Sequence, residues 1–290
     1  MTVHLPGSGF RTAVAVTLVL LASTTLTGLF SSAYRSKKRN LGEEHFHRAE
    51  QLAHDGNAQE AVVEYRRALL FEPDDSHIRL SLATSLITLH RLEEAQAHLQ
   101  QLLVEDPTNG LINLLLGRIA EQRKNPTSAI AFYHRAVYGY WPSQSDENRR
   151  NARWELVSVL QKANRRNEVT GELMQLYADA PEDPAYRSKI GFLLLQYGAT
   201  SNALEVFRDL TRTNPKYVEA YHGLGQALFD SGEYVEARHE FQRAIHLDPK
   251  DRENFSLLAE TNAVIDLDPG LPRITAAERV RRSGNLLRRV

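Results

Sequence analysis

The side chains of this chain that are best suited to bind a metal ion are its histidines. The closest set along the sequence is His45, His47 and His54. His47 and His54 are seven residues apart and would share one face of a helix, but no acidic residue follows either of them at i+4 to complete a set of ligands. The chain has no cysteine, which excludes zinc ribbons, iron–sulfur sites, disulfide scaffolds and thiol nucleophiles. We therefore predict no metal site, and solvated or half-buried histidines instead.

Motifs that carry catalysis are also missing. The sequence has no HExxH, no GxSxG, no phosphate-binding loop that ends in Gly-Lys-Ser/Thr and no EF-hand loop. Gly223 and Gly225 lie in GLGQAL, which a permissive search would read as a dinucleotide-binding loop, but no strand precedes them. We therefore predict that the chain is not an enzyme and holds no cofactor.

Charge is distributed unevenly along the 290 residues. Residues 1–41 carry five Lys/Arg and no Asp/Glu, and residues 266–290 carry six Arg against three acidic residues. Because the whole chain has a net charge of −1, residues 42–265 carry −9. Phosphate contacts need basic surface on the folded part of a protein, so an acidic body argues against nucleic acid as a partner.

The N-terminal part contains one long uncharged segment. Residues 12–34, TAVAVTLVLLASTTLTGLFSSAY, have no charged side chain, and as a helix they would cover roughly 30 Å, the thickness of a bilayer core. We predict a short flank (1–11), a transmembrane anchor (12–34) and a basic juxtamembrane linker (35–41). A cleaved signal peptide is the alternative, since Ser31 and Ala33 are small residues at cleavage spacing.

Basic residues beside this segment predict its orientation. Arg35, Lys37, Lys38 and Arg39 follow it, whereas only Arg11 and the terminal amine precede it. The positive-inside rule then places the body in the cytoplasm, with a single pass through the inner membrane. The alternative is the opposite topology, with the body in a periplasm.

A 34-residue period organises the rest of the chain. Ala61, Ala95 and Ala129 are spaced by 34, as are Pro181 and Pro215. The period defines six repeats and an insertion, Gln144 to Arg149. The repeats span residues 42–75, 76–109, 110–143, 150–183, 184–217 and 218–251.

Positions within a repeat, counted from its first residue, have a physical explanation. Small residues recur at positions 8 and 20, where two antiparallel helices would approach closely, and a large residue at position 24 would fill the space beside them. Position 15 is Gly56, Gly198 or Gly232 in three repeats, as a left-handed turn after a helix requires. Proline at position 32 in five repeats would end the second helix. This pattern predicts an all-α fold of paired helices.

The pattern resembles the tetratricopeptide repeat (TPR) family over residues 42–251, most clearly in YHGLGQALFDSGEYVEARHEFQRAIHLDP of the sixth repeat. The resemblance implies a right-handed superhelix, or α-solenoid, of six helix-turn-helix repeats. A capping helix over 252–265 would close the array, followed by an Arg-rich basic tail, 266–290. A single anchor before such repeats is similar to membrane-bound TPR proteins of the bacterial envelope.

In this family the first helices line a concave groove, usually through positions 2, 5, 9, 12 and 13. The resemblance therefore implies a groove that binds a protein or peptide partner. Carried onto this chain, the groove residues are Phe46, Glu50, Leu80, Thr84, Leu114, Arg118, Trp154, Ser158, Phe192, Gln196, His222, Gln226 and Phe229. Some family members hold a C-terminal carboxylate with Lys at position 5 and Asn at position 9, and these pairs are absent here.

Two further segments have open interpretations. Tyr138, Tyr140 and Trp141 precede the insertion and would form either an exposed aromatic partner site or, as we favour, a longer helix that packs on its own connector. The tail could form a short helix from about Thr275, interrupted at Gly284, that contacts anionic lipid. The alternatives are that the tail docks on the acidic array or stays disordered.

Together these observations predict a membrane-anchored scaffold that binds protein or peptide partners and performs no catalysis. Two alternatives are a periplasmic assembly factor for envelope or secreted components and a non-catalytic regulatory subunit of an enzyme complex.

Overall fold

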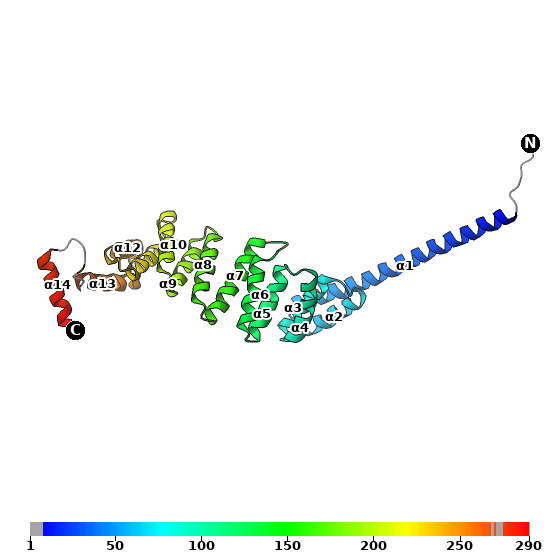
Figure 1. Cartoon of the computed structure of the whole chain (residues 1–290), viewed down its shortest axis with the longest axis horizontal. Coiled ribbons are helices and arrows are strands. Elements are labelled where there is room, and N and C mark those ends of the chain that lie inside the picture. The colour runs from blue at the N-terminus through cyan, green and yellow to red at the C-terminus, as the bar shows by residue number, and fades with distance from the viewer. Residues whose placement is uncertain (1–7, 268–269, 271–274, 290) are drawn as a thin grey trace, which may run out of the picture. The chain divides into compact units, whose positions relative to one another are not determined.

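The computed structural model describes residues 8–267, 270 and 275–289. Within these residues all fourteen elements are α-helices, which confirms the predicted all-α class (Figure 1). The chain divides into two compact bodies, which we call the N-terminal body (residues 1–124) and the C-terminal body (residues 125–290). The division falls within the third predicted repeat.

In the N-terminal body, five helices pack in chain order, each on the next. The first helices of successive repeats also contact one another, α1 with α3 and α3 with α5, so they form one layer. The five helices are α1 (Ser8–His54), α2 (Ala58–Phe71), α3 (Ser76–Thr88), α4 (Leu92–Glu105) and α5 (Gly110–Gln122).

The C-terminal body continues the same alternation, and here α9 also contacts α11 directly. Helices α3, α5, α9, α11 and α13 begin at the first residues of the segments that the 34-residue period defines. The helices of this body are α6 (Pro126–Tyr138), α7 (Ser145–Lys162), α8 (Arg166–Ala178), α9 (Pro184–Gln196), α10 (Thr200–Thr213), α11 (Val218–Asp230), α12 (Tyr234–Leu247), α13 (Arg252–Leu267) and α14 (Ala276–Arg289).

Helix α1 runs without a break from the uncharged segment into the first repeat. The predicted linker, residues 35–41, is helical because it contains neither glycine nor proline, and Arg39 bonds Glu43 one turn on at 3.0 Å. Only the last part of α1 packs on α2, where Ala49 is fully buried. Among the residues that the structure describes, no helix combines the length and apolarity needed to cross a membrane.

Two other segments are helical where the sequence predicted an insertion and a broken helix. The inserted residues from Ser145 onward form the N-terminal part of α7, which is why α7, with 18 residues, is longer than α3, α5, α9 and α11, with 13 each. Helix α14 continues through Gly284, so the predicted interruption there is wrong. Thr275 starts α14 by accepting the Glu278 backbone N–H at 3.2 Å. Arg282 then joins α14 to α13 by donating to the carbonyl of Ile265.

Close packing between the two helices of a repeat leaves space only for small residues. The Phe207 ring of α10 occupies the space beside Gly191 of α9 and Gly223 of α11. A Cβ atom on Gly191 would lie 2.6 Å from that ring, and one on Gly225 would lie 2.7 Å from Phe241. The sequence prediction that Gly225 is a packing residue, not part of a nucleotide loop, is confirmed.

Every position-15 residue has a left-handed backbone. The glycines predicted there, Gly56, Gly198 and Gly232, have φ of 82°, 75° and 80°. His90, Lys124 and Asn164 occupy the same position in the other repeats and have φ of 56°, 57° and 55°. Non-glycine residues pay a steric cost in this region, so the turn geometry is imposed by the packed helices on either side.

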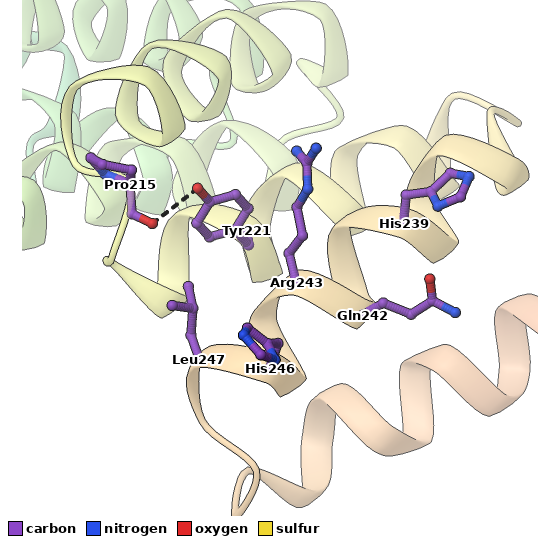
Figure 2. A pocket seen from close by; sticks show the side chains of 7 residues that line it. All are labelled: Pro215, Tyr221, His239, Gln242, Arg243, His246 and Leu247. Atoms are coloured by element: carbon purple, nitrogen blue, oxygen red, sulfur yellow. Dashed lines mark hydrogen bonds between the residues drawn. The ribbon is translucent and has the colours of Figure 1, made fainter.

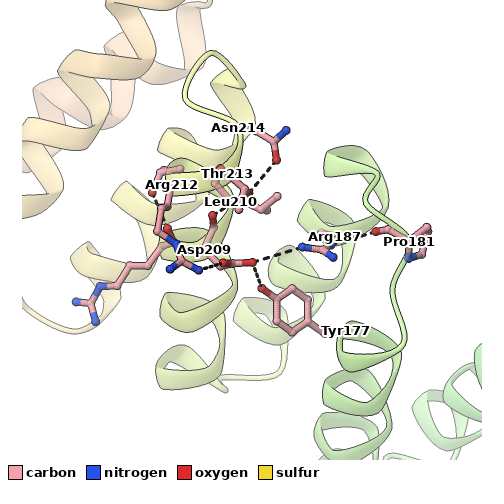
Figure 3. Close-up of polar contacts among 10 residues, drawn as sticks. Tyr177, Pro181, Arg187, Asp209, Leu210, Arg212, Thr213 and Asn214 are labelled. Carbon is pink, nitrogen blue, oxygen red and sulfur yellow. Dashed lines mark hydrogen bonds and ion pairs between the residues drawn. The ribbon is translucent and has the colours of Figure 1, made fainter.

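A polar side chain at position 4 joins most repeats to the connector before them. Tyr221 donates to the carbonyl of Pro215 at 3.0 Å (Figure 2). Arg187 donates to the carbonyl of Pro181 at 3.0 Å and also contacts Asp209 at 3.4 Å (Figure 3). Asn113 and Arg79 bond the carbonyls of Pro107 and Pro73 in the same way. We call this bond, from position 4 to the proline carbonyl six residues earlier, the proline latch.

Repeats without a proline six residues earlier use a carboxylate on their own second helix. His45 bonds Glu64 at 2.7 Å, and Arg153, which is buried, lies 3.3 Å from Glu172 and 3.0 Å from Asp179. Position 4 therefore always ties the first helix to a neighbouring backbone or helix.

In the second repeat, burial and neighbouring cations lower the pKa of a histidine. His98 of α4 is half-buried, and its Nδ1 atom has no hydrogen-bond partner. Burial lowers the pKa of His98 below 6.5, and the nearby guanidinium groups of Arg79 and Arg66 lower it further.

Two glycine-to-alanine substitutions should change stability in opposite directions. Gly223→Ala should lower the free energy of unfolding by about 1–3 kcal/mol, because the new methyl group would overlap the Phe207 ring. Gly171→Ala should raise it by about 0.5–1 kcal/mol, because Gly171 is an exposed helix residue with open space at its Cβ. Urea denaturation measures both, and equal effects of the two substitutions would contradict this packing.

Because of His98, the free energy of unfolding should decrease as the pH is lowered. The unfolded chain takes up a proton near pH 6.5, whereas the folded chain does so only at lower pH, so the unfolded state binds more protons between these values. The Tm should therefore drop as the pH falls from 7.5 to 5.5, and it should drop less in His98→Gln. Identical pH profiles of the two proteins would show that His98 is not desolvated.

Candidate functional site

The predicted groove residues of the N-terminal body differ in the surface they expose. Phe46 is half-buried, with its ring 5.2 Å from that of His77 and 6.0 Å from that of Tyr65. Glu50 is exposed and accepts a hydrogen bond from the Tyr65 hydroxyl. Leu114 is only 6% exposed and therefore contributes packing more than accessible surface. Leu80 is half-buried, and Thr84 and Arg118 are exposed.

In the C-terminal body none of the predicted groove residues is buried. They lie on α7, α9 and α11, and we call the surface of these three helices, together with α13, the first-helix face. Trp154, Ser158, Phe192, His222, Gln226 and Phe229 are half-buried, and Gln196 is exposed.

Aromatic contacts connect α7 to α9 on this face. The Trp154 indole N–H donates to the Tyr186 hydroxyl at 2.9 Å, and the two rings meet edge to face at 5.9 Å. The ammonium group of Lys189 lies 4.7 Å from the centroid of the Trp154 ring, within the range of a cation–π contact. Burial raises the pKa of Tyr186, so its hydroxyl keeps its proton at neutral pH.

A second row of contacts connects α9, α11 and α13. The ring of Phe192 meets that of His222 edge to face at 5.7 Å. On its other side His222 Nδ1 bonds the side-chain oxygen of Asn254 at 3.0 Å, and Asn254 is fully buried. Phe229 packs edge to face with Tyr234 of α12 at 5.2 Å. The face is therefore rigid, with rings held in place from behind.

Two members of this face, Tyr186 and Lys189, were missed by sequence reasoning. They stand at positions 3 and 6 of the fifth repeat, one residue after positions 2 and 5, which the family usually exposes. Ser188 at position 5 is buried instead and bonds the Tyr217 hydroxyl at 3.0 Å. The sequence signal for Tyr186 and Lys189 is Ser188 at position 5. A small residue there indicates a buried position, so the residues beside it become candidates for the exposed surface.

The aromatic segment before the insertion divides into two parts. Trp141 is 6% exposed and donates its indole N–H to the carbonyl of Ala136 at 2.9 Å. It occupies position 32, where the other repeats have proline. Tyr138 and Tyr140 are exposed at 69% and 61%, so neither predicted interpretation describes the whole segment.

The histidines near the N-terminus are engaged separately. His45 bonds Glu64 at 2.7 Å and stacks on Phe71, whereas the exposed His54 lies 3.5 Å from Asp55. Within the described parts of the chain, no group of three His, Asp or Glu residues is placed to hold a metal ion.

Two cavities of the C-terminal body lie beside its second helices. One, of about 460 Å³, lies beside α12 and is lined by Pro215, Tyr221, His239, Gln242, Arg243, His246 and Leu247 (Figure 2). Glu240 holds Arg243 at 3.1 Å, so this cavity offers imidazole and amide groups without an uncompensated charge.

A second cavity, of about 480 Å³, surrounds Asp209 of α10 (Figure 3). Hydrogen bonds from Arg212 and Tyr177 lower the pKa of Asp209, and Arg187 lies 3.4 Å from it. Tyr177 of α8 and Arg187 of α9 tie α10 to neighbouring helices, whereas Arg212 lies on α10 itself, and these contacts have a structural role.

Comparisons with known proteins agree with this repeat structure. The family model described as "Tetratricopeptide repeat" matches residues 52–119 and 194–260. The chain therefore contains tetratricopeptide repeats, and the resemblance stated from the sequence is confirmed. Repeats of this family form scaffolds for protein–protein interaction.

Similar proteins include two curated relatives and one solved structure. Small glutamine-rich tetratricopeptide repeat-containing protein 2 of Mycosarcoma maydis is 32% identical over 85 residues, which cover 28% of this chain and 24% of that protein. Human protein O-mannosyl-transferase TMTC1 is 24% identical over 252 residues, which cover 80% of this chain and 24% of that protein. This chain thus spans about a quarter of the length of these relatives. The structure of a tetratricopeptide repeat protein from Parabacteroides merdae is 17% identical, with a TM-score of 0.44 and coverage of 88% of this chain and 100% of that one.

Proposed function

We propose that this chain is a membrane-anchored scaffold that binds a protein or peptide partner along the first-helix face of its C-terminal body and performs no catalysis itself. The observation that carries the proposal is the row of partly exposed rings on adjacent first helices. Trp154, Phe192 and His222 are each fixed by a neighbour, and each keeps part of its side chain accessible.

Such rings fit a partner for two physical reasons. Fixed aromatic side chains bury large areas on binding and lose little conformational freedom, which makes them frequent centres of binding energy. The amides of Gln196 and Gln226 stand among them and offer both donors and acceptors to the backbone of a peptide. A segment laid across α9 and α11 would therefore meet apolar and polar contacts in alternation.

The anchor is supported by the surface of α1. Leu18, Leu21, Leu26, Leu29 and Phe30 are between 55% and 69% exposed. Exposed apolar side chains on one segment favour transfer to a lipid environment. We propose that residues 12–34 lie in the inner membrane as a single pass. A cleaved signal peptide is the alternative.

Basic residues support a cytoplasmic location for the repeats. Arg35, Lys37, Lys38 and Arg39 follow the proposed span directly, and such clusters favour the cytoplasmic side of a membrane. The repeats would then recruit their partner at the inner surface of that membrane. A periplasmic location is the alternative, and the cysteine-labelling experiment below distinguishes the two.

Disrupting the first-helix face should abolish partner capture. In the double variant Gln196→Arg/Gln226→Arg, two bulky cations would stand among the rings. The amount of protein that co-purifies with the full chain from detergent-solubilised membranes should fall more than tenfold, while helicity and Tm change little. Gln242→Arg, on the exposed face of α12, is the matched control and should retain capture. Equal capture by both variants would refute the proposed face.

The absence of cysteine allows a direct test of anchor and topology. In intact cells, a membrane-impermeant maleimide should label Thr2→Cys but should label Lys216→Cys only after the membrane is disrupted. Both variants should stay in the membrane pellet after alkaline carbonate. Labelling of Lys216→Cys in intact cells would place the repeats outside, and a soluble product that begins near Tyr34 would establish a cleaved signal.

A further inference from the structure

The contact between α7 and α9 combines rings with cations. Trp154 lies at its centre, bonded to the Tyr186 hydroxyl at 2.9 Å and covered on one side by the Lys189 ammonium at 4.7 Å. Arg150 stands one helical turn before Trp154 on α7 and therefore shares its face. We call Arg150, Trp154, Tyr186 and Lys189 the α7–α9 cluster.

The two cations at the edge of this cluster lack acidic partners. Among the described residues, the Lys189 ammonium contacts the Trp154 ring and forms no ion pair with a carboxylate. In the same set of residues, Arg150 forms no ion pair with a carboxylate either. Helix α9 carries Arg187 and Lys189 and no acidic residue. Arg187 and the nearby Arg153 are already engaged by carboxylates, Asp209 and Asp179. Lys189 and Arg150 thus leave a local positive charge on a chain whose middle is acidic overall.

Tyr186 adds a hydroxyl that can donate to a ligand. Its oxygen accepts the Trp154 N–H, so its own hydrogen is free to point away from the indole. Because its pKa is raised by burial, this hydrogen is present at neutral pH. An ammonium group and a hydroxyl group, both donors, therefore contact the Trp154 indole, and Arg150 stands one helical turn before it on α7.

We propose that the α7–α9 cluster binds a carboxylate of an acidic peptide segment in the partner, with the apolar part of that segment on the Trp154 ring. This inference rests on the proposed function and specifies the chemistry of its partner. Lys189 and Arg150 supply the charge, Tyr186 supplies a directed hydrogen bond, and the ring supplies apolar contact. The carboxylate replaces the ring as the neighbour of the Lys189 ammonium.

Fluorescence anisotropy with three labelled hexapeptides tests the proposal on the full chain in a non-ionic detergent. The first alternates Glu and Leu and ends in an amide. The second has Gln in place of Glu and the same amide. The third is the Gln peptide with a free C-terminal carboxylate. The first or third should bind about tenfold more tightly than the second, which also tells a side-chain carboxylate from a terminal one.

Three variants connect binding to the cluster. Lys189→Gln should weaken binding of the carboxylate peptide about fivefold, since one partly exposed ion pair contributes about 1 kcal/mol. Tyr186→Phe should weaken it without changing the dependence on salt concentration. Lys250→Gln removes an exposed lysine in the connector between α12 and α13 and should leave binding unchanged. Circular dichroism of each variant should match that of the parent.

Three results would overturn the proposal. These are equal binding of the three peptides, equal effects of Lys189→Gln and Lys250→Gln, and stronger binding of a labelled oligothymidylate than of any peptide through the same Lys189. Each leaves the proposed function intact if the Gln196→Arg/Gln226→Arg variant still loses its captured partner, so the two ideas fail separately.

Discussion

Close contact between the two helices of each repeat is the constraint on which the rest of this structure depends. Phe207 fills the space that Gly191 and Gly223 leave open, and Phe241 does the same beside Gly225. Because the second helices supply the large rings, the first helices can approach without bulky residues at these positions. Their remaining surface is then free for rings such as Trp154, which contacts Tyr186 of the next first helix, and Phe192, which contacts His222 of the next first helix as well as Phe207 of its own repeat.

The proline latch adds direction to this packing. Apolar contact between helices is not directional, whereas a hydrogen bond to one particular carbonyl fixes where a connector ends. Tyr221 and Arg187 each bond the proline carbonyl six residues earlier, and Arg187 also reaches Asp209 on the following helix. The position of one first helix is thereby set by the end of the helix before it, which keeps the spacing of α7, α9 and α11 regular enough for rings to meet at about 5–6 Å.

Periodicity alone was enough to predict the helix pairs, because small residues, turns and prolines recur every 34 residues. It also predicted the left-handed turns at Gly56, Gly198 and Gly232, but not those at His90 and Lys124, where local preference is overruled by packing. Side-chain direction was less predictable. Lys189 is exposed in place of Ser188, which turns inward to Tyr217, a contact between residues 29 apart that no local pattern records, whereas Tyr186 is half-buried against Trp154. Trp141 is buried at a proline position, where its indole N–H donates to the carbonyl of Ala136.

The proposed functional surface of this protein is the first-helix face of the C-terminal body. The central claim is that a partner binds on that face. Site-specific photocrosslinking in cells tests it most directly, with benzoylphenylalanine in place of Gln226 on α11 or in place of His239 on the exposed side of α12. The account predicts a discrete crosslinked protein from position 226 and none from position 239. Crosslinks from position 239 alone, or the same product from both, would contradict it.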